Sequence, residues 1–251
     1  MSTPLYVDET GEGEPALVLL HGFAATHRAW DGVRAALGSG VHVLAFDLPG
    51  HGRSLDFPDA GPARVAAEAV CAVLDTRGIR RFHLAGHSFG GAVAALIALA
   101  RPQDVASLTL FAPGGLGPEI NAPLLRRLAV ADSAGEVRDC LALMCGRGGA
   151  SEAVVSEAMA MGATPRQLTL LTRISKLITR DGRQGVLPRD LLAALEVPVH
   201  VVWGRLDAVL PVRQTSDLPI RFSRHIFADL GHMLPVEAPE EMARILRRAI
   251  G

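Results

Sequence analysis

The sequence predicts an α/β protein with a doubly wound, mostly parallel sheet and a helical lid. Two observations support this prediction. Short apolar runs alternate with longer helical patterns, which is typical of parallel sheets whose crossovers place helices on both faces. One segment, residues 118–195, has no β-branched strand run and interrupts this rhythm. We therefore expect a core built from residues 1–117 and 196–251, with 118–195 inserted as the lid.

The strands of the first half are predicted from aliphatic runs, as expected for strands that are buried on both faces. They cover residues 16–20, 41–46, 81–85 and 105–111. The helices between them combine an apolar side with recognisable ends, and cover residues 27–37, 62–77 and 89–100. Pro62 opens the second of these helices and Gly78 follows its end, which is the usual placement of both residue types.

The second half of the chain predicts the lid and the remaining part of the sheet. Within the lid we expect helices at residues 122–131, 137–144, 153–161 and 166–178. After it we expect strands at 199–203 and 225–227 and a final helix at 239–250. Ligands of open α/β sheets bind at the carboxyl ends of the strands, so the residues that follow each predicted strand are the first candidates for a site.

Composition and charge exclude several classes of protein. The 251 residues are 49% apolar and 20% charged, which suits one domain with a large buried core. A net charge of -1 gives no electrostatic reason to expect nucleic acid or a membrane surface. Three cysteines without metal or redox spacing indicate reduced thiols, and the chain start lacks the pattern of a secretory signal. We expect a cytoplasmic protein that binds a small-molecule substrate, in an oligomeric state that the sequence leaves open.

The strongest chemical signal is the sequence Gly-His-Ser-Phe-Gly at residues 86–90. It matches the G-x-S-x-G nucleophile elbow, with an apolar strand before it and an apolar helix after it. Such a sharp turn holds its serine in a strained conformation, and side chains at Gly86 and Gly90 would collide across it. We therefore predict that Ser88 is a nucleophile.

A serine hydroxyl is a weak nucleophile and needs a base. In proteins with this elbow, an acid and then a histidine follow the serine along the chain. His232 directly follows the last predicted strand, and Asp207 follows the strand before it. We predict that His232 is the base and that Asp207 orients it. Asp229 is a rival acid, but only three residues from His232 it is more suited to capping the turn.

Two backbone amides are expected to bind the oxyanion that forms during attack on a carbonyl. One belongs to Phe89, directly after the nucleophile. The other is assigned to Phe23, in the loop after the first long strand, where Gly22 permits a tight turn. His87 is expected to pack or to line the pocket. No histidine pair has metal-binding helical spacing and no glycine-rich phosphate loop follows a strand, so we expect no metal and no cofactor.

Taken together, these motifs resemble those of the α/β-hydrolase superfamily over essentially the whole chain. The matching segments are residues 21–23, 47–54, 86–91 and 231–232, in that family's order. The resemblance implies the α/β-hydrolase fold and a Ser-Asp-His triad at Ser88, Asp207 and His232.

Residues 112–121 look like the hydrolase-like module of acyltransferase components in acetoin dehydrogenase complexes. The sequence begins at this module and contains no lipoyl domain, and its only lysine, Lys176, falls in a predicted lid helix. We therefore expect no direct acyl-carrier role. The same region also resembles the hydrolases of meta-cleavage products, although those usually carry Asn where this chain has His87.

Three classes of function remain open at this stage. The first is a serine hydrolase that forms an acyl-serine on a small apolar ester, thioester or lactone. The second is a carbon–carbon hydrolase of meta-cleavage-type diketones, and the third is a non-catalytic binding module. Apolar side chains of the lid are expected to form the substrate pocket; they are Leu124, Leu125, Leu128, Met144, Met159, Met161 and Leu170.

Overall fold

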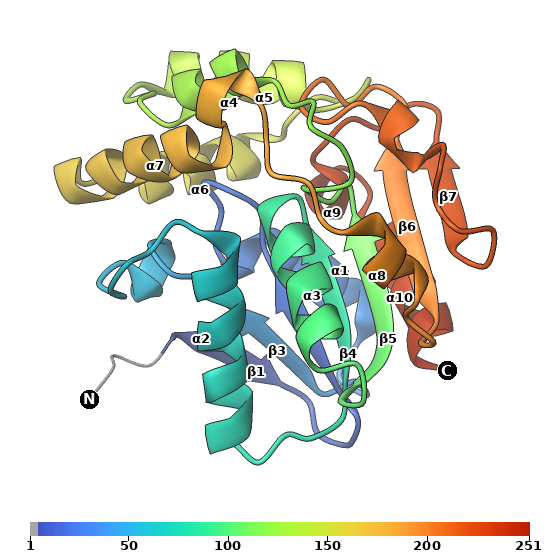
Figure 1. The fold of residues 1–251 in the computed structure, drawn as a ribbon. Coiled ribbons are helices and arrows are strands. Elements are labelled where there is room, and N and C mark those ends of the chain that lie inside the picture. The colour runs from blue at the N-terminus through green and yellow to red at the C-terminus, as the bar shows by residue number, and fades with distance from the viewer. Residues whose placement is uncertain (1–4) are drawn as a thin grey trace.

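The computed structural model describes residues 5–251 (Figure 1). Residues 1–4 lie outside this part of the chain. They are the first residues of the segment in which the sequence predicts no secretory signal. Within residues 5–251 no helix is long and apolar enough to span a bilayer.

A seven-stranded sheet forms the centre of the molecule, with the strand order β1-β3-β2-β4-β5-β6-β7. β1 is antiparallel to β3, and every other neighbouring pair is parallel. The strands are β1 (Val7–Thr10), β2 (Ala16–Leu20), β3 (Val43–Phe46), β4 (Phe82–His87), β5 (Val105–Phe111), β6 (Val199–Gly204) and β7 (Ser223–Phe227). The predicted doubly wound, mostly parallel sheet is confirmed, and its six parallel strands were all predicted within three residues.

The edge strand β1 was not predicted. Its sequence Val-Asp-Glu-Thr has no apolar run, and its residues are half-buried or exposed. It is a strand because its backbone pairs with β3, in the register Val7 to Phe46. By contrast, every residue of β2 and β3 is buried, which is why their aliphatic runs were recognisable.

Helices cover both faces of the sheet (Figure 1). One face carries α2, α3 and α8, and the other carries α1 and α10. Their bounds are α1 (Asp31–Leu37), α2 (Ala63–Thr76), α3 (Phe89–Ala100), α8 (Arg189–Ala193), α9 (Leu234–Glu237) and α10 (Pro239–Ile250). The helix predicted at 27–37 is divided into a 3₁₀ turn, His27–Trp30, and α1. The short helices α8 and α9 were not predicted.

Four helices between β5 and β6 lie above the edge at which the central strands end (Figure 1). They are α4 (Ala122–Leu128), α5 (Ala134–Met144), α6 (Glu152–Met161) and α7 (Pro165–Ile178). We call them the insertion helices. Each begins after an Asn, Ser or Thr whose side chain accepts a hydrogen bond from the helix backbone, which satisfies a free N–H group. Although α8 falls inside the range 118–195, it packs against α3 on one face of the sheet.

Candidate active site

The turn from β4 to α3 presents Ser88 at the carboxyl edge of the sheet. Ser88 has φ 51° and ψ -114°, a strained conformation for a residue with a side chain. Two glycines make the turn possible. A Cβ at Gly86 would lie 2.2 Å from the carbonyl oxygen of Gly90, and a Cβ at Gly90 would lie 2.4 Å from that of His21. The backbone therefore fixes the position of the serine.

Ser88, His232 and Asp207 form one hydrogen-bonded chain, although they are far apart in the sequence. The Ser88 Oγ lies 2.9 Å from the His232 Nε2, and the His232 Nδ1 lies 2.8 Å from the Asp207 Oδ2. The side chains of His232 and Asp207 are 2% and 0% exposed. The structure thus brings together the three residues that the sequence singled out. A carboxylate accepts only, so Nδ1 of His232 carries the proton and Nε2 is left to accept from Ser88.

The loop after β6 holds Asp207 in place. Its Oδ1 accepts hydrogen bonds from the backbone N–H groups of Val209 and Leu210, each at 2.8 Å. Its Oδ2 is then directed at His232. The rival acid Asp229 is 64% exposed and pairs with Arg147 at the surface, at 3.0 Å. Asp207 therefore stands next to the histidine, and Asp229 does not.

The amide of Phe23 lies in the loop after β2, and that of Phe89 lies at the start of α3, directly after Ser88. Neither N–H group donates to an acceptor within residues 5–251. The carbonyl oxygen of Gly22 accepts from the His21 Nδ1 at 2.7 Å. In a planar trans peptide the C=O and N–H groups point in opposite directions, so the Phe23 N–H points away from His21. Both amides are thus free to bind a ligand.

Comparison with known proteins agrees with this geometry. A sequence model of the alpha/beta hydrolase family matches residues 17–245. The chain belongs to this family. Membership of this family makes the protein a hydrolase.

Two similar proteins are the dihydrolipoyllysine-residue acetyltransferase components of acetoin cleaving systems from Cupriavidus necator and Pseudomonas putida. They are 29% and 33% identical over 96% and 92% of this chain. The chain spans only 65% and 62% of their lengths. A meta-cleavage product hydrolase from Pseudomonas fluorescens IP01 superposes with a TM-score of 0.84 at 20% identity, covering 98% of this chain and 93% of that one. That likeness concerns the fold. A 2-hydroxy-6-oxononadienedioate/2-hydroxy-6-oxononatrienedioate hydrolase from Burkholderia vietnamiensis is 28% identical over 96% of this chain and 89% of its own length. Both resemblances noted in the sequence are confirmed.

His87, next to Ser88 in this α/β hydrolase, packs behind the hydrogen-bonded chain of Ser88, His232 and Asp207. Its Nε2 donates a hydrogen bond to the carbonyl oxygen of His232 at 2.8 Å. Burial, and then the neighbouring His232, lower the pKa of His87 to about 3. In the neutral ring Nε2 carries the proton and Nδ1 is unprotonated. This Nδ1 faces Gly22, where an added Cβ would lie 2.8 Å from it. His87 therefore supports the backbone of His232 and the Gly22 loop.

Glu237 holds the loop that carries His232, and the sequence did not reveal it. Its carboxylate accepts from the backbone N–H groups on both sides of the histidine, those of Gly231 at 2.9 Å and Met233 at 2.8 Å. It also accepts from the N–H of Gly146, just after α5, at 2.6 Å. The only signal for this role was a glutamate one helical turn after Met233, next to Pro235. One carboxylate thus joins the sheet side of the site to the insertion.

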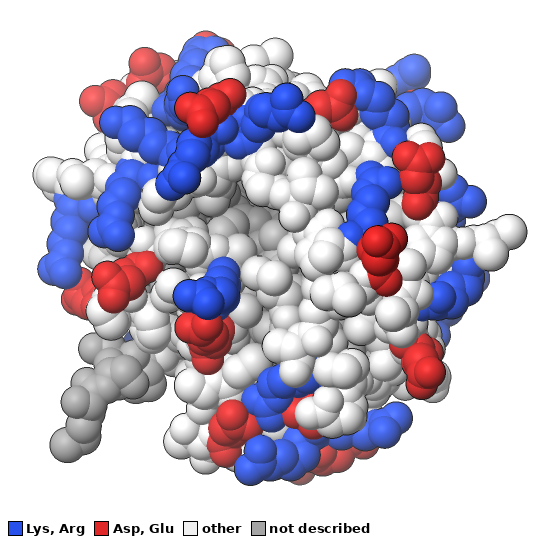
Figure 2. Space-filling model, viewed as in Figure 1, with Lys and Arg blue, Asp and Glu red and all other residues white. Residues whose placement is uncertain are grey.

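Two cavities lie on either side of Ser88 and His232 in this α/β hydrolase. The first has a volume of about 380 Å³ and is lined by Ser88, Phe23 and Phe89. The second, of about 350 Å³, lies between the segment after β2 and helices α5 and α6. A constriction of about 20 Å³, lined by Ser88 and His232, lies between them. Phe23 lines all three spaces. Figure 2, which has the same viewpoint as Figure 1, shows a hollow near the centre of the molecular surface, surrounded mainly by uncharged atoms.

The predicted pocket residues of the insertion divide between these spaces. Leu125 lines the first cavity, and Leu128, Met144 and Met161 line the second. The prediction was wrong for three residues, which line neither cavity: Leu124, Met159 and Leu170. Leu170 faces a shallow site beside Phe57. The helical periodicity identified buried faces but not which of them meet the sheet edge.

Within residues 5–251 no cluster of three or more His, Cys, Asp or Glu side chains is arranged to hold a metal ion. The cysteines do not contribute a reactive thiol to the site. Burial raises the pKa of Cys145, the one nearest to the His232 loop, to about 12, so its thiol stays protonated and unreactive at neutral pH.

Proposed function

We propose that this α/β hydrolase is a serine esterase that acts on a small, largely apolar carboxylic ester, thioester or lactone. The observation that carries the proposal is the continuous hydrogen-bonded chain from Ser88 through His232 to Asp207, which ends at a 380 Å³ cavity with apolar walls. In this proposal Ser88 is the nucleophile, His232 the general base and Asp207 the residue that orients and stabilises the imidazole.

In the first step, the Nε2 of His232 takes the proton of the Ser88 hydroxyl as Oγ attacks the carbonyl carbon. The imidazole becomes positively charged, and the buried carboxylate of Asp207 stabilises that charge through Nδ1–H. The two hydrogen bonds from Val209 and Leu210 keep the carboxylate aligned. The geometry needs no rearrangement of the triad before the attack, since both links are already at hydrogen-bonding distance.

The carbonyl oxygen becomes an oxyanion in the tetrahedral intermediate, and the N–H groups of Phe23 and Phe89 are proposed to bind it. Both are unoccupied by protein acceptors within the described chain. The N-terminus of α3, which begins at Phe89, adds its dipole in the same place. Each such donor contributes about 2.7–4 kcal/mol of transition-state stabilisation in comparable enzymes.

Collapse of the intermediate leaves an acyl group on Ser88, and the leaving group takes its proton from His232. The leaving group therefore departs on the side of the constriction, which His232 lines. The acyl group then occupies the first cavity, which is lined by Ser88 and both oxyanion residues but not by His232. A water activated by His232 subsequently hydrolyses the acyl-serine.

The test is hydrolysis of 4-nitrophenyl esters of increasing acyl length, with Ser88→Ala measured beside the native protein. We expect turnover to fall by about 10⁴-fold or more in Ser88→Ala, because the attacking oxygen is removed. Ser216→Ala, at an exposed serine, is the matched control and should keep full activity. Equal turnover by Ser88→Ala, or no turnover by the native protein on any ester, would refute the proposal.

A further inference from the structure

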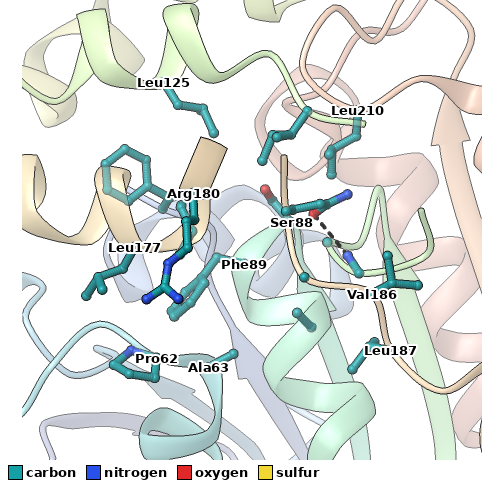
Figure 3. Close-up of a pocket in the computed structure, with 18 of the residues that line it drawn as sticks. Pro62, Ala63, Ser88, Phe89, Leu125, Leu177, Arg180, Val186, Leu187 and Leu210 are labelled. Carbon is teal, nitrogen blue, oxygen red and sulfur yellow. Dashed lines mark hydrogen bonds between the residues drawn. The ribbon is translucent and has the colours of Figure 1, made fainter. Parts of the chain in front are cut away.

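The first cavity contains one charged side chain, that of Arg180. The residues that line it are otherwise apolar or glycine, with Ser88 and Gln184 as the polar exceptions. Figure 3 shows the Arg180 side chain among these residues, extending from the end of α7 toward Pro62 and Ala63 at the start of α2. Arg180 is an exposed residue, and its guanidinium group is the one positive charge that a ligand in this cavity could meet.

The polar groups of Gln184 are already used by the protein. Its Oε1 accepts from the N–H of Gly115 at 3.0 Å, and its Nε2 donates to the carbonyl oxygen of Gly117 at 2.7 Å. These bonds tie the segment after α7 to the loop after β5. Gln184 therefore shapes the wall of the cavity, and the polar recognition of a ligand away from Ser88 is left to Arg180.

Arg180 has no acidic partner within residues 5–251. The arginine of the second cavity differs in this respect, since Arg28 lies 3.3 Å from Glu157 and 3.7 Å from Asp31. In the second cavity one arginine thus faces two carboxylates, and its positive charge has acidic partners. Of these two cavities, only the first offers a positive charge without an acidic partner.

The backbone that carries Arg180 is held by the fold. Its carbonyl oxygen accepts from the N–H of Arg183 at 3.0 Å. The preceding residue, Thr179, is buried and bound by Arg126 through both its side-chain oxygen, at 3.1 Å, and its carbonyl oxygen, at 2.7 Å. The base of the Arg180 side chain is thus fixed at the rim of the cavity.

We propose that the first cavity accepts an acyl group that ends in a carboxylate, and that Arg180 binds this carboxylate. The proposal rests on the esterase function above, which assigns the acyl group to this cavity. The apolar walls would contact the methylene chain, and the guanidinium would pair with the single negative charge at its far end. A single cation matches a monoanion best, because a phosphate dianion would retain one uncompensated charge. The substrates are then half-esters or half-thioesters of dicarboxylic acids.

The decisive comparison uses two esters whose acyl chains have the same number of carbons, 4-nitrophenyl hexanoate and mono-4-nitrophenyl adipate. Only the adipate ester carries a terminal carboxylate. We expect Arg180→Gln to lower kcat/KM for the adipate ester by about five- to tenfold, mainly through KM, because a partly exposed ion pair contributes modestly. The hexanoate ester should be unaffected. Added salt should reduce the native preference for the adipate ester.

Arg183→Gln is the matched control, since Arg183 is exposed, lies three residues away and does not line the cavity. It should leave the ratio of the two kcat/KM values unchanged. An equal effect of Arg180→Gln on both esters would overturn the proposal, because Arg180 would then only shape the wall. An adipate-to-hexanoate ratio that Arg180→Gln leaves at its native value would overturn it as well.

A binding measurement separates this proposal from the proposed esterase function. Calorimetry with Ser88→Ala reports the affinity for both esters without any turnover. Tighter binding of the adipate ester, lost in Ser88→Ala/Arg180→Gln, would support the carboxylate subsite even if the native protein hydrolysed neither ester. Equal affinities for the two esters would overturn it, whatever the outcome of the turnover assay.

Discussion

The two halves of the site are held by different kinds of contact. On the sheet side, backbones approach so closely that only glycine fits, as at Gly86 and Gly90. On the insertion side, capped helices pack through side chains, and a Cβ at Gly135 in α5 or at Gly148 after it would meet no atom within 4 Å. At Gly86 and Gly90 the sheet side has no room for a side chain, whereas parts of the insertion do. Substitutions on the sheet side should therefore determine whether the site forms at all. Substitutions on the insertion side should determine which substrates it accepts.

The largest expected effect comes from adding one methyl group to each half. Gly90→Ala would place a Cβ 2.4 Å from two backbone carbonyl oxygens, those of Leu20 and His21. Neither can move cheaply, so we expect a loss of about 1–3 kcal/mol of stability or more, together with loss of esterase activity. The same change at Gly135, inside a helix and with open space around it, should stabilise the protein by about 0.5–1 kcal/mol. Thermal unfolding and ester turnover of both variants test this contrast, and equal behaviour would contradict it.

Lowering the pH should also destabilise the protein through histidines that all lie in the sheet half. Burial lowers the pKa of His21 to about 4 and those of His51 and His87 to about 3, while no histidine occurs between residues 118 and 195. In the folded state these rings are protonated only at low pH. In the unfolded state their pKa values lie near 6.5, so they are protonated as the pH falls below that value. Stability is therefore complete above pH 6.5 and falls as the pH drops toward 4, by about 1.4 kcal/mol per pH unit for each histidine.

Urea unfolding between pH 6.5 and 5 measures this slope, because most carboxylates remain ionised there. His51→Gln removes one of the three groups and should make the slope shallower. An unchanged slope in that variant, or a native midpoint that does not vary with pH, would show that these rings do not control acid stability.

The same contrast explains what the sequence could predict. The strand, elbow and helix around Ser88 are contiguous, and their glycines and aliphatic residues report the local backbone directly. Asp207 and His232 were identified because each follows a strand that ends at the same edge. Glu237 was not, because its role depends on the fold bringing the loop around His232 close to a distant segment, whose Gly146 N–H also binds this carboxylate. No local sequence pattern indicates that these segments lie close together in the fold.

An intermediate effect is expected where the two halves are joined. Glu237→Gln keeps an acceptor oxygen but removes the charge and turns an NH₂ group toward N–H donors. Hydrogen bonds to charged groups contribute about 1.5–3 kcal/mol, so we expect a loss of stability of about that size. We also expect a lower kcat with little change in KM, because the loop around His232 would loosen. Glu240→Gln, at an exposed residue on α10, is the control and should match the native protein. A change confined to KM would contradict this positioning role.

The smallest effect is expected at the rim of the first cavity. Leu177 on α7 covers Gly61, where a Cβ would lie 2.6 Å from its Cδ1, and its side chain is 38% exposed. Leu177→Ala should lower stability by only about 1 kcal/mol, because the residue is partly exposed and only the buried part of its apolar surface is lost. It should open the cavity toward α2 and move the best 4-nitrophenyl ester to a longer acyl chain, with a change in kcat/KM of about fivefold, or 1 kcal/mol. Leu191→Ala on α8, at a residue 57% exposed and outside the cavity, should leave the optimum in place. If both variants kept the native chain-length optimum, the insertion would not set acyl length at this position, and the walls on α3 would be the next to test.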